Sequence, residues 1–167
     1  MRRIRIMRAQ DETRRVRLRH CVRHLEQFSL ERGVPVIRNS MTPGVLGRVE
    51  DRRILLRTGL GVEQQVLTLV HELTHLIAHV SARPQINRTV CEYEAEAVEK
   101  WVGTELGVPP YDQIDLATVT DDLLACSVVR VRWAARTLLS AVRGEPVAFT
   151  ACSITGAIHR RDLDSVR

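Results

Sequence analysis

The most informative segment of the chain is Val66-Leu67-Thr68-Leu69-Val70-His71-Glu72-Leu73-Thr74-His75-Leu76-Ile77-Ala78-His79. It places His-Glu-x-x-His inside an apolar run with the period of a helix. Residues four apart share one helix face, so His71 and His75 can direct ring nitrogens toward one point, as two zinc ligands do. Glu72 lies about 100° further round the axis. We expect its carboxylate to act as the general base that activates a zinc-bound water.

A catalytic zinc needs a third protein ligand and keeps one open position. The position ten residues after His71 holds Ser81, so a histidine at that spacing is excluded. An acidic segment further along the chain is the better source, because it offers four carboxylates, Glu92, Glu94, Glu96 and Glu99.

Two of these carboxylates remain alternatives on the residues alone. Glu92 has the small Ala95 on its side of the helix, which would allow close approach to the histidine helix. However, Thr89-x-x-Glu92 is also a capping box, in which Glu92 would only tie down a helix end. In that case Glu94 would be the ligand.

Two further residues are expected to contact ligands without touching the metal. Glu96 stands one turn beyond Glu92 and is placed to accept a hydrogen bond from the outer nitrogen of a ligand histidine. His79 continues the four-residue spacing, but a straight helix curves away from a single ion over three such steps. We therefore expect His79 to be a neighbour of the site rather than a ligand.

The hydrophobic period and the positions of glycine and proline predict an α+β domain. A small, mostly antiparallel sheet of about three strands should pack on a pair of helices, with one helix before it and a long helix after it. We expect a single domain over residues 1–144 and a loosely attached tail over 145–167. The expected helices are 13–32, 62–80, 89–106 and 120–142, and the expected strands are 34–38, 45–49 and 53–57, the last two forming a hairpin.

The composition is that of a globular protein, with 44% hydrophobic residues in a chain of 167. Its four cysteines are scattered without a C-x-x-C pair, which indicates free thiols in a reducing compartment rather than disulfides or a cysteine zinc cluster. The N-terminal segment has no apolar region of a secretory signal, and no apolar run approaches the ~18 residues of a membrane span. These features predict a cytoplasmic protein that does not enter the membrane.

The net charge is +5, and arginines cover much of the predicted first helix. Direct contact with nucleic acid through this basic helix is compatible with that charge. A solvated outer face is the favoured interpretation, because no DNA-reading motif accompanies the arginines.

Residues 45–142 resemble the ImmA/IrrE-type zincin metallopeptidases, and especially the zincin domain of ArdC-like antirestriction proteins. The resemblance implies a gluzincin-like set of metal ligands, His71, His75 and Glu92, with Glu72 as the catalytic acid/base. Departures are Thr74, where glycine is common, Glu96, where asparagine is common, and Glu99, where alanine is common. The matching stretches are Arg53-Ile54-Leu55-Leu56, residues 68–79, residues 92–98 and Arg132-Trp133-Ala134-Ala135-Arg136-Thr137-Leu138-Leu139.

The leading hypothesis is a zinc-dependent metalloendopeptidase, with an extended substrate aligned beside the strand at 53–57. If the resemblance extends to role, the substrate is an intracellular protein such as a DNA-binding regulator or transcriptional repressor. The alternative is a nucleic-acid- or protein-binding module with a structural zinc site, in which Glu72 would be dispensable.

Overall fold

The computed structural model describes residues 2–79, 87–109 and 121–147, and within these ranges the side chains of 10–79, 87–109 and 127–147. The fold is α+β, as predicted. In chain order the elements are α1 (Arg2–Leu30), β1 (Val36–Asn39), β2 (Gly47–Glu50), β3 (Arg53–Arg57), α2 (Val62–Thr74), a π-helical segment η1 (His75–His79), α3 (Arg88–Leu106) and α4 (Asp121–Val142).

The three strands form a sheet in the order β1-β3-β2. β3 pairs with β2 antiparallel and with β1 parallel, so the sheet is mixed rather than mostly antiparallel. After β1 the chain returns in the opposite direction as β2, at the far edge of the sheet. The hairpin then places β3 between β1 and β2. Asp51 and Arg52 make the hairpin turn, with φ of 48° and 59°, as a two-residue turn of type I′ requires. The predicted hairpin is thereby confirmed.

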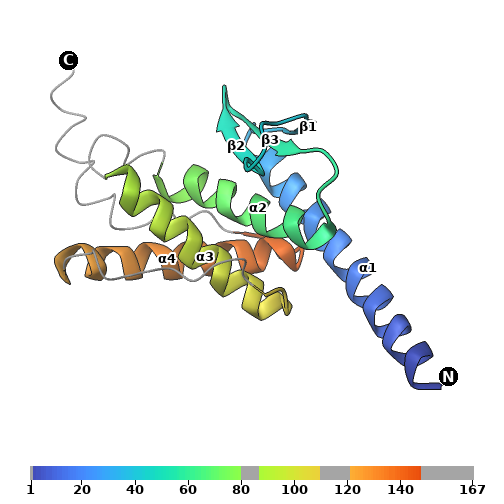
Figure 1. Ribbon diagram of the computed structural model, residues 1–167. Helices are drawn as coiled ribbons and strands as arrows, with labels where there is room; N and C mark the ends of the chain where they lie inside the picture. The colour runs from blue at the N-terminus through green and yellow to red at the C-terminus, as the bar shows by residue number, and fades with distance from the viewer. Residues whose placement is uncertain (1, 80–86, 110–120, 148–167) are drawn as a thin grey trace, which may run out of the picture.

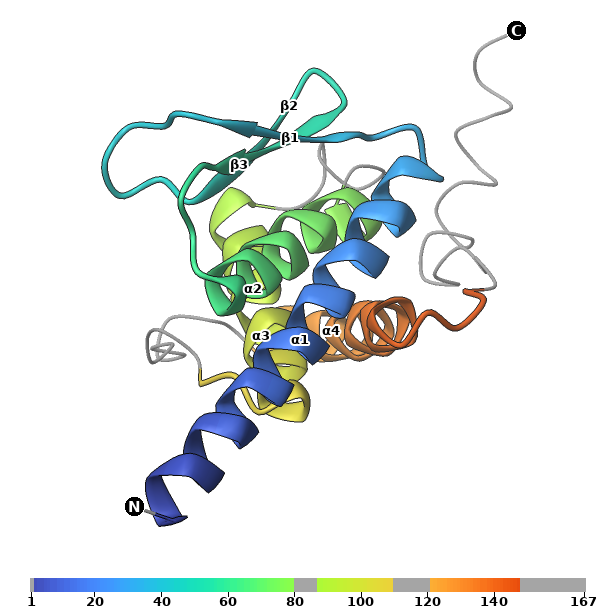
Figure 2. The same cartoon turned by 90° about the vertical axis from the view of Figure 1, so that its right-hand side faces the viewer.

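The sheet lies over α2, and α1 crosses beside them, as Figures 1 and 2 show. α2 packs against α1 and α3, and α4 packs against α3 and α1. The helix α2 therefore stands at the centre, between the sheet and the other helices. Its buried apolar side chains join those of β3, α1, α3 and α4 in one core, whose largest fully buried members include Leu18, Leu25, Ile54, Leu56, Leu67, Leu69, Leu73 and Leu138.

Helix α1 begins at Arg2 instead of residue 13, so the predicted start is wrong. Its first turns run beyond the body of the molecule (Figure 1), which is why they carry no apolar stripe that sequence reasoning could detect. The predicted stripe further along is confirmed, since its members are all buried: Leu18, Cys21, Val22, Leu25 and Phe28.

Two arginines of α1 serve the fold. Arg14 and Arg17 donate to the carbonyl oxygens of Gly107 and Leu106, at 2.5 and 3.0 Å, where the last carbonyls of α3 lack partners in the helix. Gly107 itself has a φ of 70° and caps α3 as predicted. At least part of the basic face of α1 is therefore explained by packing between helices.

Helix α4 buries Ala135, Leu138 and Val142 as predicted, but Val128 is 50% exposed. The expected stripe is therefore wrong at Val128, and its first member, Leu124, lies outside the described side chains. The expected helix caps at Thr118 and Thr120, and the tail from residue 148 on, lie outside the described residues. Within the described ranges, none of the helices is both long and apolar enough to cross a membrane.

Candidate metal centre

His71 lies in the last turn of α2 and His75 is the first residue of η1, one turn further on, and their Nε2 atoms are 3.1 Å apart. The α-helix ends at Thr74, whose hydroxyl donates to the carbonyl of Val70 at 2.8 Å. Such a bond back to the preceding turn tends to bend a helix. The chain then continues as the π-helical η1, a feature that is common at functional sites.

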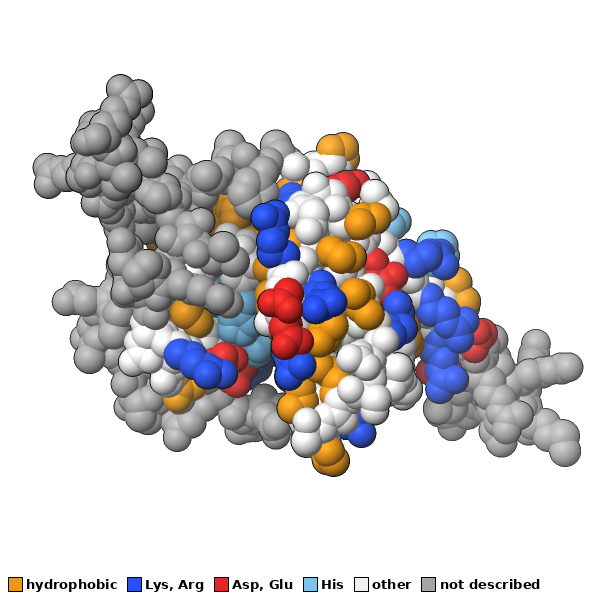
Figure 3. Space-filling view, turned by 90° about the horizontal axis from the view of Figure 1, so that it is seen from above, with side chains coloured by type: hydrophobic (Ala, Val, Ile, Leu, Met, Phe, Trp, Pro, Cys, Tyr) orange, Lys and Arg blue, Asp and Glu red, His pale blue; other side chains and the backbone are white. Residues whose placement is uncertain are grey.

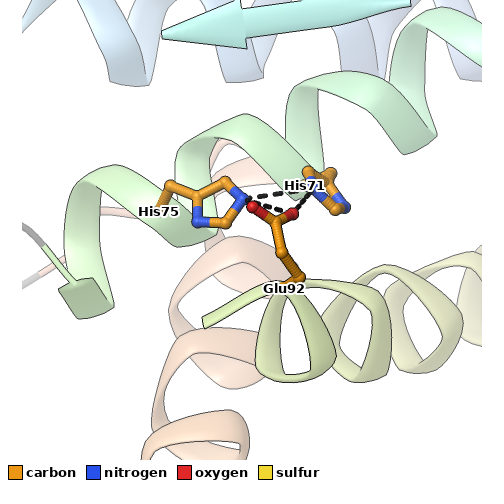
Figure 4. A group of neighbouring side chains, drawn as sticks. All are labelled: His71, His75 and Glu92. Carbon is orange, nitrogen blue, oxygen red and sulfur yellow. Dashed lines mark hydrogen bonds and ion pairs between the residues drawn. The ribbon is translucent and has the colours of Figure 1, made fainter. Parts of the chain in front are cut away.

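Glu92 reaches both histidines from α3. Its Oε2 atom lies 3.4 Å from Nε2 of His71 and 3.4 Å from Nε2 of His75 (Figure 4). The cap of α3 is Asn87, whose side chain accepts from the backbone N–H of Thr89. The capping-box interpretation of Glu92 is therefore wrong, because α3 begins at Arg88, one residue before Thr89, and Asn87 caps it.

The spacing of the three ligand atoms fits a tetrahedral metal ion. Bonds of about 2.0–2.1 Å in a tetrahedron place neighbouring ligand atoms about 3.3–3.4 Å apart. The observed separations are 3.1, 3.4 and 3.4 Å. His71, His75 and Glu92 also form the metal-capable group found among the described residues. Two imidazoles and a carboxylate are the donor types that zinc accepts, and three of them leave one position open.

The protonation of the histidines suits this role in part. Burial, and then the neighbouring His71, lower the pKa of His75 to about 4, so its ring is neutral and has a lone pair to offer. For His71, burial lowers the pKa, but the hydrogen bond to Glu99 and the charges of Glu72, Glu99 and Glu92 outweigh it, and the pKa is raised. A metal ion would have to displace a proton from His71.

Glu99, a residue that was not expected in this role, supports a histidine of the pair. Its Oε2 lies 3.2 Å from Nδ1 of His71, whereas the side chain of Glu96 is exposed. The helix phase explains the difference. Relative to Glu92, Glu96 lies about 40° further toward solvent and Glu99 about 20° back toward buried Ala95. The structure shows this contact for Glu99, and the expected role of Glu96 stays a prediction.

His79 lies beside His75, as expected for a neighbour of the site. The two Nδ1 atoms are 3.1 Å apart, and the other nitrogen of His79, Nε2, is 2.9 Å from Oε2 of Glu94. Glu94 is only 2% exposed and binds Arg130 of α4 through both oxygens. A carboxylate held in this way is directed away from the three ligand atoms, which disfavours Glu94 as the alternative ligand.

Glu72 lies beneath strand β2. It is 7% exposed, and burial raises its pKa to about 7, with only partial opposition from His71 and the backbone N–H of Val49. Gly47 makes this position possible. A Cβ atom there would lie 2.5 Å from Cγ2 of Thr68 and 3.2 Å from Cγ of Glu72. Sequence reasoning missed Gly47, because only the tertiary contact gives it a function.

The site opens into a cleft of about 640 Å³, and Figure 3 shows histidine side chains exposed on this face of the molecule. β2 contributes one wall and α3 another. Residues 53–57, beside which we expected the substrate to align, form β3. This is the central strand, and both its edges are already paired, with β1 and β2, so it cannot pair with a substrate. The lining residues include Val45, Gly47, Val49, Arg88, Cys91 and Glu92.

Comparison with known proteins gives one match. The family described as Peptidase_M78, IrrE N-terminal-like domain, matches residues 29–117, which include the three strands, α2, η1 and all of α3. No curated protein and no solved structure matches the chain. The closer likeness to ArdC-like proteins stays a prediction. Because the match covers more than half of the chain and contains the whole candidate metal centre, the chain belongs to the Peptidase_M78 family of IrrE N-terminal-like metallopeptidase domains.

Proposed function

We propose that the protein is a zinc-dependent metalloendopeptidase in which His71, His75 and Glu92 hold the metal and Glu72 is the general base. One observation carries the proposal. Two Nε2 atoms and one carboxylate oxygen form a triangle with sides of 3.1, 3.4 and 3.4 Å at the floor of an open cleft. This is the triangle that three ligands of one tetrahedral zinc would make.

Bound zinc would act as a Lewis acid on the substrate carbonyl and lower the pKa of the attacking water. Glu72 is placed for the proton transfers. Its carboxylate can accept a proton from the water and then deliver it to the leaving amine. Gly47 and the N–H of Val49 hold this carboxylate beside the histidines.

An extended peptide would align along β2. This strand lines the cleft, and in the described part of the chain it pairs on one side only, with β3. A sheet edge of this kind can accept a peptide as an additional strand through backbone hydrogen bonds. Because such pairing is largely independent of side chains, selectivity would come from the lining residues at each end of the cleft.

We further propose a cytoplasmic protein substrate, with a DNA-binding regulator such as a repressor as the first candidate to test. This finer assignment follows the resemblance to ImmA/IrrE-type peptidases rather than any feature of the cleft. Direct contact with nucleic acid through α1 is not favoured, since Arg14 and Arg17 are engaged by α3 and Glu63.

The test compares wild type with Glu72→Gln, using Glu63→Gln, at the start of α2 and outside the cleft, as the matched control. Each protein is analysed for bound zinc and then incubated with a library of peptides and unfolded proteins, whose cleavage products are identified by mass spectrometry. We expect zinc in all three, and cleavage that falls about 10²–10⁴-fold in Glu72→Gln alone. Equal cleavage by wild type and Glu72→Gln would exclude Glu72 as the base, and wild type without zinc would refute the metal centre.

A further inference from the structure

The strongest unassigned feature is a chain of buried polar side chains that leads from His75 into the interior. It passes through His79, the last residue of η1, and Glu94 of α3, and it ends at Arg130 and Ser127 of α4. The metal centre described above uses neither Glu94 nor any residue of α4. Buried polar groups are costly unless each finds partners, so such a chain requires an explanation.

The metal-binding role of His75 fixes which atom donates in each hydrogen bond along this chain of side chains. Nε2 of His75 faces His71 and Glu92, so as a metal ligand it carries no proton, and the ring proton lies on Nδ1. Nδ1–H of His75 then donates to Nδ1 of His79 across 3.1 Å. His79 must in turn carry its proton on Nε2 and donate it to Glu94 across 2.9 Å. One set of tautomers satisfies every group.

The far end of the chain is firmly anchored. Both oxygens of Glu94 accept from Nε of Arg130, at 3.0 and 2.9 Å, and Oε1 also accepts from the hydroxyl of Ser127 at 2.7 Å. The side chains of His79 and Glu94 are each 2% exposed and that of Arg130 is 13% exposed. A carboxylate with these partners remains an acceptor, and it fixes the orientation of the imidazole that donates to it.

We propose that His79 and Glu94 are positioning residues of the metal centre, which orient the His75 ring and fix its tautomer while Arg130 of α4 holds Glu94. The two ligand histidines would then be supported differently. His71 relies on one carboxylate, Glu99, which is 20% exposed, and His75 relies on a buried relay across three elements. The inference rests on the proposed function, because it assumes that His75 binds a metal.

Zinc affinity measured by competition with a chromophoric chelator tests this inference. His79→Phe keeps the volume of the ring but removes both hydrogen bonds, and we expect zinc to bind about 10–100-fold more weakly. His79→Asn retains a side-chain oxygen that can accept from His75 near the place of Nδ1, so its affinity should lie between the two. Glu94→Gln keeps the shape and removes the charge, and its loss should be smaller. His20→Phe, on the exposed face of α1, is the matched control and should bind zinc as wild type does.

Two further measurements separate positioning from general damage. Denaturant unfolding of the metal-free variants reports any loss of stability, and the visible spectrum of the cobalt-substituted proteins reports the geometry at the metal. We expect an altered cobalt spectrum in His79→Phe even where the metal-free protein is folded. If wild type binds zinc and His79→Phe binds it equally tightly, the inference is wrong while the proposed function stands. The inference is also wrong if His79→Asn binds zinc as weakly as His79→Phe. If wild type binds no zinc, both fail.

Discussion

Two buried carboxylates on opposite sides of the histidines behave in opposite ways. Glu72 and Glu94 are 7% and 2% exposed, yet the pKa of Glu72 is raised to about 7 and that of Glu94 is lowered to about 2. Burial raises the pKa of both. For Glu94, hydrogen bonds with His79, Arg130 and Ser127 lower the pKa again. For Glu72, only His71 and one backbone N–H lower it. The partners of a carboxylate, rather than its depth, therefore decide whether it stays an anion or exchanges protons near neutral pH.

The contrast suggests a division of labour within the site. On the side of the sheet, a carboxylate without a fixed cation is available to move protons. On the side of α4, a carboxylate locked by a guanidinium cannot do so and serves to hold other groups in place.

Arg130→Met should have the largest effect on stability. It removes the cation from a buried pair and leaves Glu94 without its main partner, which typically costs about 3–5 kcal/mol of folding free energy. Urea unfolding of the metal-free protein measures it. Arg132→Met, an exposed arginine of the same helix, is the control and should change little. A loss below that of the control would mean that Glu94 is not held as an anion.

The two carboxylates should give the metal-free protein opposite dependences on pH. The pKa of Glu72 is raised on folding, so its contribution to stability is present below pH 4.5 and is lost as the pH rises to about 7. At 1.36 kcal/mol per pKa unit the loss is about 3 kcal/mol. Glu72→Gln should remove it, so that the variant gains stability relative to wild type between pH 4.5 and 7.

Glu94 should show the reverse. Its pKa is lowered on folding, so its contribution is present above pH 4.5 and is lost as the pH falls toward 2. Unfolding curves of wild type, Glu72→Gln and Glu94→Gln across this range measure both effects. Parallel curves for the two variants would show that the carboxylates do not differ as described.

Gly47→Ala should cost about 1–3 kcal/mol, the usual penalty for an additional methyl group in a packed site. The new Cβ would meet Cγ2 of Thr68 and the side chain of Glu72. Thr68→Ser removes the methyl group that the Cβ would strike, so the double variant Gly47→Ala/Thr68→Ser should recover much of the loss. Thermal unfolding checks this, and a fully stable Gly47→Ala would show that β2 does not press on Glu72.

Arg17→Met should have the smallest effect, below about 1 kcal/mol, because its bond to the carbonyl of Leu106 lies at an exposed surface. Arg19→Met, whose partner is Glu12 of the same helix, should have still less. The losses of folding free energy in these two variants show what an arginine at the surface contributes, for comparison with the loss in Arg130→Met. A cost of several kcal/mol for Arg17 would remove the distinction between the two arginines.

The three candidate metal ligands could be predicted from the sequence, because their placement depends on helix periodicity. The spacing of His71 and His75 and the small Ala95 near Glu92 are local properties, and the structure brings the three candidate ligands together. Glu99 could have been found by the same reasoning, since seven residues bring it almost back to the angle of Glu92.

The residues that surround these ligands could not be predicted, because their roles depend on contacts between segments that are distant in the chain. Nothing near Arg130 in the chain indicates that it binds Glu94, 36 residues earlier. Gly47 likewise acquires its importance only from the approach of β2 to α2. The parallel pairing of β1 with β3 is another long-range choice that hydrophobic alternation does not encode.

The most direct test is a crystal structure of the zinc-loaded protein, with anomalous data collected on both sides of the zinc absorption edge. The account predicts one anomalous peak, about 2.0–2.2 Å from Nε2 of His71, Nε2 of His75 and a carboxylate oxygen of Glu92, with Glu72 close by but not coordinated. A peak on Glu94 or Glu72, or a fourth protein ligand that closes the site, would contradict it.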